Sequence, residues 1–377
     1  MKKWKEVRLQ DLVYFQRGFD ITKDKQELGD VPVISSSGVT SYHNKYMADG
    51  PGVIMGRKGS LGTIYFSKEN YWPHDTTLWS KDFKGNDPKY AYYFLHTFDF
   101  KNFNVGGANP TLNRNHIHDL RIPLPPLPTQ QRIAAILSAY DDLIENNRRR
   151  ITLLEDSARL LYKEWFVKFQ FPSHEKVKVK NGLPEGWERG AITDFYKTSS
   201  GGTPSRTKPE YFTGEINWVK TQELKNGFIF DTDEKITKDA VQNSSAKLFP
   251  ENTVLFAMYG ATIGQLGIIA KESTTNQACC AFIPMHHSAN YIYMFLFLLE
   301  NKLRFINLSQ GAAQPNVNQE VMKQFPMLMP NKFLMDNFVS SLSPIFNQIK
   351  TLTHQTQKLR EARNILLPKL MNGTIEV

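Results

Sequence analysis

The sequence predicts a mixed α/β (α+β) protein made of two similar globular domains separated by two long helices, which pair as an antiparallel coiled coil in a pseudo-twofold internal repeat. Three observations support this architecture. Short motifs occur twice, in the same order, along the 377 residues. A heptad pattern follows each set of motifs, and brief apolar runs typical of buried strands lie between the motifs. A chain of this length suffices for two or three domains of about 150 residues each.

The repeat is visible as three pairs of matched segments, and the sequences between them differ almost completely. The matched segments are 4–12 with 187–195, 53–59 with 254–260, and 106–113 with 311–318. The offset between the copies grows from 183 to 205 residues, so the second copy carries insertions. A duplicated frame with divergent interiors suggests one scaffold that recognises two different targets.

A long helix is expected after each copy. Thr129 is the predicted N-cap of the first helix, and the apolar residues that follow recur at alternating steps of four and three, which is the heptad pattern of a coiled coil. Adding the repeat offset of 205 to these positions gives the corresponding seam of the second helix, in which fewer residues are apolar. The residues predicted to pair the helices are Ile133, Leu137, Ile144, Asn147, Ile151, Leu154, Leu161, Ile345, Ile349, Leu352, Leu359 and Leu366. The alternative is two unrelated amphipathic helices, each packed on its own domain.

Three polar residues and one proline interrupt the apolar pattern of the two predicted helices. Asn147 in the first seam, and Thr356 and Arg363 in the second, are polar residues at seam positions, which fix the register at some cost in stability. Ser343-Pro344 suits an N-cap followed by the first helical position. Because proline disrupts a helix interior, the second helix is expected to begin late or to kink there.

The globular parts are expected to combine strands and helices. Short apolar runs predict buried strands with their hairpin partners at 52–55 with 62–66 and at 253–258 with 267–270. Aromatic-rich runs at 90–97 and 291–299 predict buried helices. Proline, glycine and alternating lysines at 171–186 indicate a linker.

Charge and composition narrow the class of protein. The chain has 46 Lys and Arg residues against 37 Asp and Glu residues, a net charge of +9. This excess suits a polyanionic partner such as nucleic acid, although proteins of lysine-rich proteomes are also basic. No apolar run is long enough to span a bilayer, and no signal-peptide pattern follows Met1. The adjacent Cys279 and Cys280 cannot form a normal disulfide loop, so we expect a cytoplasmic protein.

The motifs of common enzymes are missing from the sequence. Residues 56–62 resemble a phosphate-binding loop, but a strand pattern follows them, which favours a tight turn. Cys279-Cys280 with His286-His287 is a poor zinc site because adjacent ligands strain tetrahedral coordination. There is no Asn-Pro-Pro-aromatic tetrad, nucleophile elbow or His-Glu-x-x-His helix. We therefore predict neither catalytic residues nor metal ligands.

Several motifs occur in an order typical of one protein family. Each copy closes with Gly-small-small-Asn/Gln-Pro-x-aliphatic-Asn, an apolar-proline run occupies 122–128, and Gln130-Gln131-Arg132-Ile133 opens the first long helix. Together with the segments 161–169, 199–205 and 359–370, this order resembles the specificity subunit of Type I restriction–modification systems. The first copy departs from the family pattern. It has Arg17-Gly18-Phe19-Asp20 in place of Gly-Gly-Thr-Pro, and Asn109 where Gln is usual.

The resemblance implies a non-catalytic DNA sequence-specificity subunit. Each target-recognition domain would read one half of a bipartite site in double-stranded DNA. The helices would set the spacer and dock two methyltransferase subunits, and two restriction (motor-nuclease) subunits would join for cleavage. No cofactor is expected in this chain, because S-adenosylmethionine, ATP and magnesium would belong to the partner subunits. The implied parts are target-recognition domain 1 at 1–127, spacer helix 1 at 128–170, a linker at 171–186, target-recognition domain 2 at 187–330 and spacer helix 2 at 331–377.

Two other functions stay open at this point. One is a self-contained DNA-modifying enzyme with unrecognised catalytic residues, and the other is a coiled-coil adaptor without a DNA role.

Turns at matched positions with different side chains are the candidate DNA-reading sites. An Arg or Lys at the first turn suits the O6 and N7 acceptors of guanine, and Gln265 at the second suits adenine. Arg206 and Lys220 lie in a segment inserted in the second copy and are expected to hold phosphates. The predicted DNA-contacting residues are Arg57, Lys58, Ser60, Arg206, Lys220, Tyr259, Thr262 and Gln265. The alternative is that these turns only close hairpins.

Overall fold

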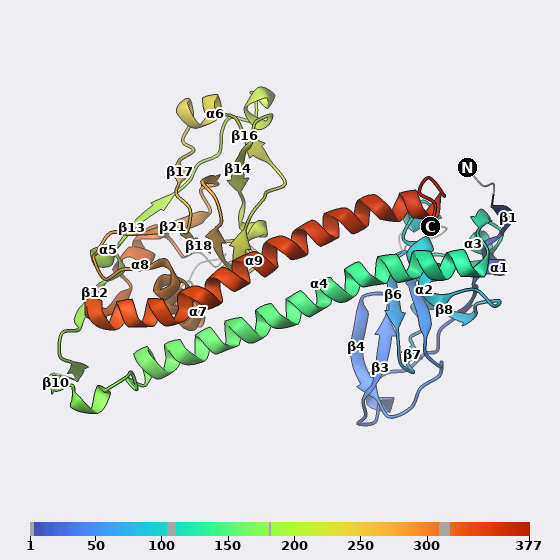
Figure 1. Cartoon of the computed structure of the whole chain (residues 1–377), viewed down its shortest axis with the longest axis horizontal. Helices are drawn as coiled ribbons and strands as arrows, with labels where there is room; N and C mark the ends of the chain where they lie inside the picture. The colour runs from blue at the N-terminus through green and yellow to red at the C-terminus, as the bar shows by residue number, and fades with distance from the viewer. Residues whose placement is uncertain (1–3, 104–110, 181, 309–316) are drawn as a thin grey trace. The chain divides into compact units, whose positions relative to one another are not determined.

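The computed structural model describes residues 4–103, 111–180, 182–308 and 317–377. Contacts divide the chain into two compact units, of which the first comprises Met1–Asn146 with Gln357–Val377 and the second Asn147–Thr356 (Figure 1). Each unit therefore contains one α/β domain and a part of both long helices. The predicted motif residues 106–110, including Asn109, and 311–316 lie outside the described residues.

The domain of the first unit is built on two small sheets. The four-stranded antiparallel sheet has the order β2-β8-β5-β6, with β2 at Tyr14–Arg17, β8 at Thr77–Asp82, β5 at Gly52–Gly56 and β6 at Ile64–Ser67. The three-stranded sheet has the order β4-β3-β7, with β4 at Gly38–His43, β3 at Val31–Ser35 and β7 at Trp72–Pro73. A separate pair joins β1 at Lys5–Arg8 to β9 at Arg121–Leu124. Strand β5 is buried throughout, which explains its unbroken apolar sequence.

The α-helices that the structure describes in this domain are short. They are α1 at Leu9–Leu12, α2 at Pro88–Leu95 and α3 at Arg114–His118. Asp87 caps α2 by accepting a hydrogen bond from the Tyr90 N–H at 2.8 Å. Tyr90, Tyr93 and Phe94 of α2 are buried in the domain core, as the aromatic-rich run predicts, and Tyr92 is half-buried against it.

The domain of the second unit contains a larger version of the same arrangement. Its five-stranded sheet has the order β13-β21-β18-β19-β15, with β13 at Tyr196–Ser200, β21 at Cys279–Pro284, β18 at Val254–Ala257, β19 at Leu266–Ile269 and β15 at Gly227–Ile229. Its four-stranded sheet has the order β16-β14-β20-β17, with β16 at Lys235–Ile236, β14 at Ile216–Val219, β20 at Ser273–Thr275 and β17 at Leu248–Phe249. A further pair joins β12 at Glu188–Ala191 to β22 at Pro326–Met329.

The helices of this domain are α5 at Ile192–Phe195, α6 at Lys238–Gln242, α7 at Tyr291–Leu308 and α8 at Gln319–Gln324. Helix α7 is buried as predicted, but it extends nine residues beyond the predicted end at 299 because Phe305 also packs into the core. Among the described residues, none of the helices has the combination of length and apolar character needed to cross a membrane.

The two domains use the same backbone hydrogen-bonding frame. In the first unit the Leu112 N–H donates to the Arg57 carbonyl at 2.8 Å, and in the second unit the Val317 N–H donates to the Met258 carbonyl at 2.8 Å. The order of the first three strands is also shared, since β2-β8-β5 corresponds to β13-β21-β18. These equivalences confirm the internal repeat that the matched segments predict.

Two long helices pair in an antiparallel sense. Helix α4 spans Leu127–Tyr162 and continues into a π-helical turn at Lys163–Val167, and α9 spans Lys332–Met371. In the first unit the start of α4 packs with the end of α9, since Ile133 shares a core with Leu370. In the second unit the end of α4 packs near the start of α9, where Tyr162 contacts Phe338. Each residue predicted to pair the helices is buried or half-buried.

Two details of the helix prediction were wrong. Helix α4 begins at Leu127, so Thr129 lies in its first turn, where its N–H donates to the Pro126 carbonyl at 2.9 Å, and is not the N-cap. Helix α9 begins at Lys332 rather than near Pro344. The turns before the proline are held because Phe338 and Leu342 are fully buried. Burying two such side chains is worth about 3–6 kcal/mol, which offsets the cost of about 3 kcal/mol for an internal proline.

The segment predicted as a linker has some structure of its own. Within it, β10 at Val179–Lys180 pairs with β11 at Leu183–Pro184 as a short antiparallel hairpin. Phe171, at the beginning of the segment, is buried and its ring lies 5.9 Å from that of Trp187. The start of the segment is thus packed on the domain of the second unit.

Candidate nucleic-acid interface

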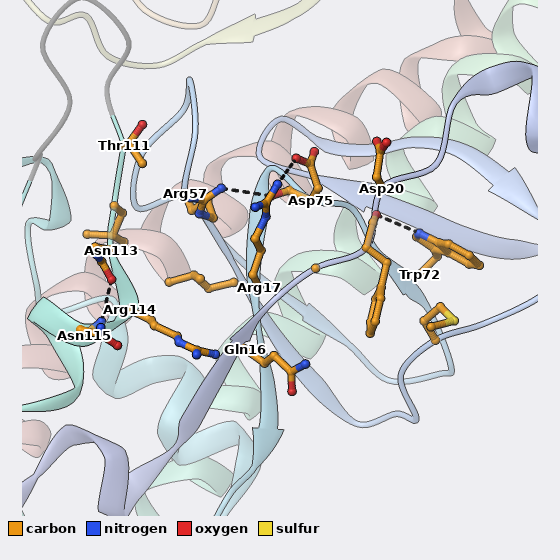
Figure 2. Close-up of a pocket in the computed structure, with 15 residues that line it drawn as sticks. Gln16, Arg17, Asp20, Arg57, Trp72, Asp75, Thr111, Asn113, Arg114 and Asn115 are labelled. Atoms are coloured by element: carbon orange, nitrogen blue, oxygen red, sulfur yellow. Dashed lines mark hydrogen bonds and ion pairs between the residues drawn. The ribbon is translucent and has the colours of Figure 1, made fainter.

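A polar cavity of about 910 Å³ opens in the domain of the first unit (Figure 2). Its wall includes the end of β2 with the residues that follow, the turn after β5, and the start of α3 with the residues before it. Residues from β7 to β8 and Met47, between β4 and β5, complete the lining. The side chains that give the cavity its chemical character are Gln16, Arg17, Asp20, Arg57, Asp75 and Arg114. The cavity therefore offers several planar hydrogen-bond donors beside carboxylate acceptors.

Asp75 is the residue of this cavity that several cationic side chains contact. Its Oδ2 atom lies 2.8 Å from Nη2 of Arg17 and 3.9 Å from Nζ of Lys58. Nη1 of Arg57 donates to the backbone carbonyl of Asp75 at 3.5 Å. Partial burial and the neighbouring Arg17 lower the pKa of Arg57, while Asp75 raises it. Two cationic side chains, Arg17 and Lys58, thus approach one half-buried carboxylate, and a third, Arg57, contacts the backbone of the same residue. This arrangement leaves donors available for a ligand.

Asp75 also belongs to the group of potential metal-binding atoms found in the described part of the chain. The ligand-type atoms of Asp20, His74 and Asp75 all lie within 4.8 Å of one another. One oxygen of Asp75 already accepts from Arg17, so a bound cation would have to compete with that guanidinium. These are not the residues weighed as a zinc site from the sequence, which are Cys279-Cys280 with His286-His287.

The predicted turn residues have different surroundings. Arg57 and Lys58 join the Asp75 cluster, whereas Ser60 is exposed and its carbonyl accepts from Thr63 at 3.1 Å. Both turns close hairpins through equivalent backbone hydrogen bonds of 2.9 Å, from the Gly62 N–H to Gly56 and from the Gly264 N–H to Ala257. In the second turn Tyr259, Thr262 and Gln265 are all half-buried.

Arg206 and Lys220 meet at a shared carboxylate in the second unit. Arg206 forms a two-fold hydrogen bond with Glu234 at 2.7 and 2.9 Å, and Lys220 contacts the same carboxylate at 3.0 Å. The Arg206 guanidinium also lies 4.1 Å from the centre of the Phe212 ring. The hydrogen bond from Arg206, and with it the hydrogen bond from Lys220, lower the pKa of Glu234 to about 2, although partial burial opposes the shift. A phosphate bound here would therefore compete with Glu234.

The two cysteines are packed in different cores. They are neighbours on β21, so their side chains point to opposite faces of the sheet. Cys279 packs with Leu255 and Ala281, and Cys280 packs with Phe256 and Phe282. Burial raises the pKa of both thiols, to about 12 for Cys280. These thiols are neutral at physiological pH.

The residues that complete the charged cavity, Arg17, Asp75 and Arg114, are not among the residues predicted from the sequence to contact DNA. In the sequence Arg17 is distinctive only as part of the departure from the family motif, and no motif contains Asp75 or Arg114. Arg17 and Asp75 are 58 residues apart in the sequence and meet because β2 pairs with β8. No periodicity in the sequence reports such a contact.

Two α/β domains with one hydrogen-bonding frame and different polar side chains, combined with an antiparallel helix pair, define a protein built by internal duplication. Comparison with known families agrees with this class. The family model described as "Type I restriction modification DNA specificity domain" matches residues 1–156 and 184–361. The chain belongs to this family, and it is a specificity subunit of the Type I restriction–modification kind.

Relatives of the same description match most of the chain. The Type I restriction enzyme MjaIX specificity subunit of Methanocaldococcus jannaschii is 25% identical over 391 residues, covering 93% of this chain and 88% of the relative. The HindI specificity subunit of Haemophilus influenzae is 24% identical, covering 71% and 72%. The crystal structure of the specificity subunit from M. genitalium has a TM-score of 0.68 at 15% identity, covering 98% of this chain and 96% of that chain, and shares the fold.

Proposed function

We propose that this protein directs its complex to a bipartite DNA sequence, with one half of the site read by each α/β domain. The observation that carries the proposal is the common backbone frame of the two domains, which holds arginines and acidic residues in one and hydroxyl and amide side chains in the other. A net charge of +9 favours binding to the phosphate backbone. Domains with one frame and different contact residues are suited to reading two different half-sites.

The helices act in this proposal as the element that sets the spacer. Helix α4 has 36 residues, which correspond to about 54 Å at about 1.5 Å per residue. One turn of DNA is about 34 Å, so a helix pair of this length can hold two readers on successive major grooves.

The same helices dock two methyltransferase subunits. Leu153 and Leu160 of α4 are 68% and 63% exposed, and their spacing of seven residues places them on one face of the helix. Exposed leucines on one helix face suit a protein partner. Adenine methylation and ATP-dependent cleavage then reside in two methyltransferase and two restriction subunits. S-adenosylmethionine, ATP and magnesium are cofactors of those partners.

The predicted turn residues remain our candidates for direct contacts with DNA. Arg57, Lys58 and Gln265 are proposed to contact bases. Arg206 and Lys220 are proposed to contact phosphates by exchanging Glu234 for the DNA backbone.

The test compares the isolated chain with the reconstituted complex. The purified chain is incubated with duplex DNA and labelled S-adenosylmethionine, alone and with the methyltransferase subunit encoded by the same system, and methylated adenines are mapped. The proposal expects no methyl transfer by the chain alone and methylation at one bipartite sequence in the complex. Methyl transfer by a chain free of other subunits would instead identify a self-contained enzyme. A chain that binds no DNA at low salt and adds no specificity to the complex would be a helical adaptor.

A further inference from the structure

The two domains place chemically different side chains at one shared position of their frame. Arg17 is the last residue of β2 and pairs with Leu78 of β8. Ser200 is the last residue of β13 and pairs with Cys280 of β21. Because β2 and β8 correspond to β13 and β21 in the repeat, Arg17 and Ser200 are structural equivalents.

Asp75, the partner of Arg17, is also replaced in the second unit by a residue of different chemistry. The Arg57 and Met258 N–H groups, which are equivalent, donate at 2.8 and 2.9 Å to the carbonyls of residues 76 and 278. The residues directly before these acceptors are Asp75 and Gln277. The second unit thus has an amide where the first unit has the carboxylate that holds Arg17.

The starts of α3 and α8 give a third equivalent pair. Asn113 caps α3 and Asn318 caps α8, and the next residues are Arg114 and Gln319. Ser200 donates a hydrogen bond to Oε1 of Gln319 at 3.3 Å, so this amide lies beside the equivalent of Arg17. A cationic set in the first unit therefore corresponds to a neutral amide and hydroxyl set in the second.

We infer that this shared position reads a base pair in each domain, a G·C pair in the first half-site and an A·T pair in the second. The inference rests on the proposed function and names the chemistry of its site. Arginine donates to the O6 and N7 atoms of guanine, and aspartate accepts from N4 of cytosine. Arg17, at the end of β2, and Asp20, three residues further on, both line the cavity and supply this donor and acceptor (Figure 2). The amides of Gln277 and Gln319 match N6 and N7 of adenine, and on binding they exchange their hydrogen bonds with the hydroxyls of Thr203, Ser200 and Thr198 for the base.

Asp75 is a positioning residue in this arrangement. Its carboxylate accepts from Nη2 of Arg17 at 2.8 Å and holds this end of the guanidinium in place, while the remaining N–H groups stay available for guanine. A phosphate ligand suits the cavity less well. It would lie near the carboxylates of both Asp20 and Asp75, whose oxygens are within 4.8 Å of each other. The edge of a base pair offers donors as well as acceptors and does not meet this repulsion.

The test is a selection of DNA duplexes with randomised sequence by the full-length chain, followed by sequencing of the bound pool. Arg17→Ala, Arg17→Lys and Asp75→Asn are compared with the unaltered protein, and Lys81→Ala, which removes an exposed charge from β8, is the control. We expect guanine to be preferred at one position of one half-site. Both Arg17 variants should lower that preference by about 5- to 150-fold and leave the other half-site unchanged. Asp75→Asn should lower it at the same position without changing the salt dependence of binding.

The lysine variant separates a base contact from a phosphate contact. Lysine keeps the positive charge of arginine but lacks its planar fork of donors. A phosphate contact would therefore leave the preference for guanine normal in Arg17→Lys, and Arg17→Ala would weaken binding to all DNA sequences equally. That result would overturn the inference. A bipartite preference that none of the three variants alters would overturn the inference and leave the proposed function intact. An unaltered protein with no bipartite preference would overturn both.

Discussion

Asp141 of α4 and Arg363 of α9 form an ion pair that joins the two long helices within the first unit. The other carboxylate oxygen of Asp141 accepts a hydrogen bond from the Tyr93 hydroxyl at 2.6 Å. One carboxylate therefore ties the helix pair to α2 of the globular domain. Arg363 was predicted as a polar seam residue, and its contact with Asp141 fixes the register of the helices at this level.

Removal of this carboxylate should destabilise the first unit. Asp141→Ala leaves the Arg363 guanidinium and the Tyr93 hydroxyl without their shared acceptor. Both side chains of the ion pair are about 30% exposed, so we expect a loss of about 1–2 kcal/mol in the free energy of unfolding, measured by urea denaturation. Asp142→Ala, at the exposed neighbouring position, should change stability by less than about 0.5 kcal/mol. Equal effects of the two substitutions would show that the contacts of Asp141 contribute nothing to the free energy of unfolding.

The glutamine motif at the start of α4 should be important for stability. Oε1 of Gln130 accepts from the Asp87 N–H at 3.0 Å, and its Nε2 donates to Asn86 at 2.8 Å and to the Pro125 carbonyl at 2.9 Å. Gln130 is 1% exposed, so Gln130→Ala leaves buried groups unpaired. We expect a loss of about 1–3 kcal/mol in urea denaturation. The adjacent Gln131 is exposed and gives the matched control, for which Gln131→Ala should have almost no effect.

His118 should make the first unit sensitive to mild acid. Its Nε2 atom accepts a buried hydrogen bond from the Phe15 N–H at 3.0 Å, which requires the neutral imidazole. Burial lowers the pKa of His118 below 6.5, Arg114 lowers it further and Asp119 raises it; the Tyr14 ring also faces the imidazole. Because the folded protein favours the neutral form, this stabilisation is complete above pH 6.5 and is lost as the pH falls through the lowered pKa.

The measurement is the urea midpoint of the unaltered protein and of His118→Gln between pH 7.5 and pH 5. The difference in stability between them should shrink as the pH falls. Parallel pH curves for the two proteins would mean that His118 does not contribute to the acid sensitivity.

Matched insertions in both helices should lengthen the spacer of the DNA site. The boundary between the units crosses both helices, after Asn146 and after Thr356. One heptad inserted at each place adds about 10 Å of helix, or roughly 3 base pairs at about 3.4 Å each. Mapping of the methylated site should show the same two half-sites with a longer gap. An insertion in one helix alone mismatches the seam and should reduce stability, and an unchanged gap after matched insertion would contradict the role of the helices as a spacer.

The architecture could be predicted from the sequence because it depends on patterns that the sequence displays. The matched segments gave the internal repeat, and the heptads from Ile133 and their transfer by the repeat offset gave the helix pair. Local rules failed at Thr129 and Pro344, where tertiary packing outweighs capping and proline preferences. Burial of Phe338 and Leu342 is a property of the folded chain and cannot be read from the residues next to the proline.

Less of the candidate site than of the architecture could be predicted from the sequence. Arg57 and Lys58 were found because they lie in a matched turn. Asp75 was missed because its importance comes from its contact with Arg17 across two strands that are distant in the sequence. The equivalence of Arg17 and Ser200 becomes visible only through the backbone hydrogen bonds that the two domains share.

The central claim, that the two domains read separate halves of one DNA site, is tested most directly by exchanging one domain. Residues 1–127 are replaced with the first domain of another family member, and the methylated sequence of the reconstituted complex is mapped at single-base resolution. The account predicts that one half-site changes to that of the donor protein while the other half-site and the gap stay the same. A change in both halves, or in neither, would contradict it.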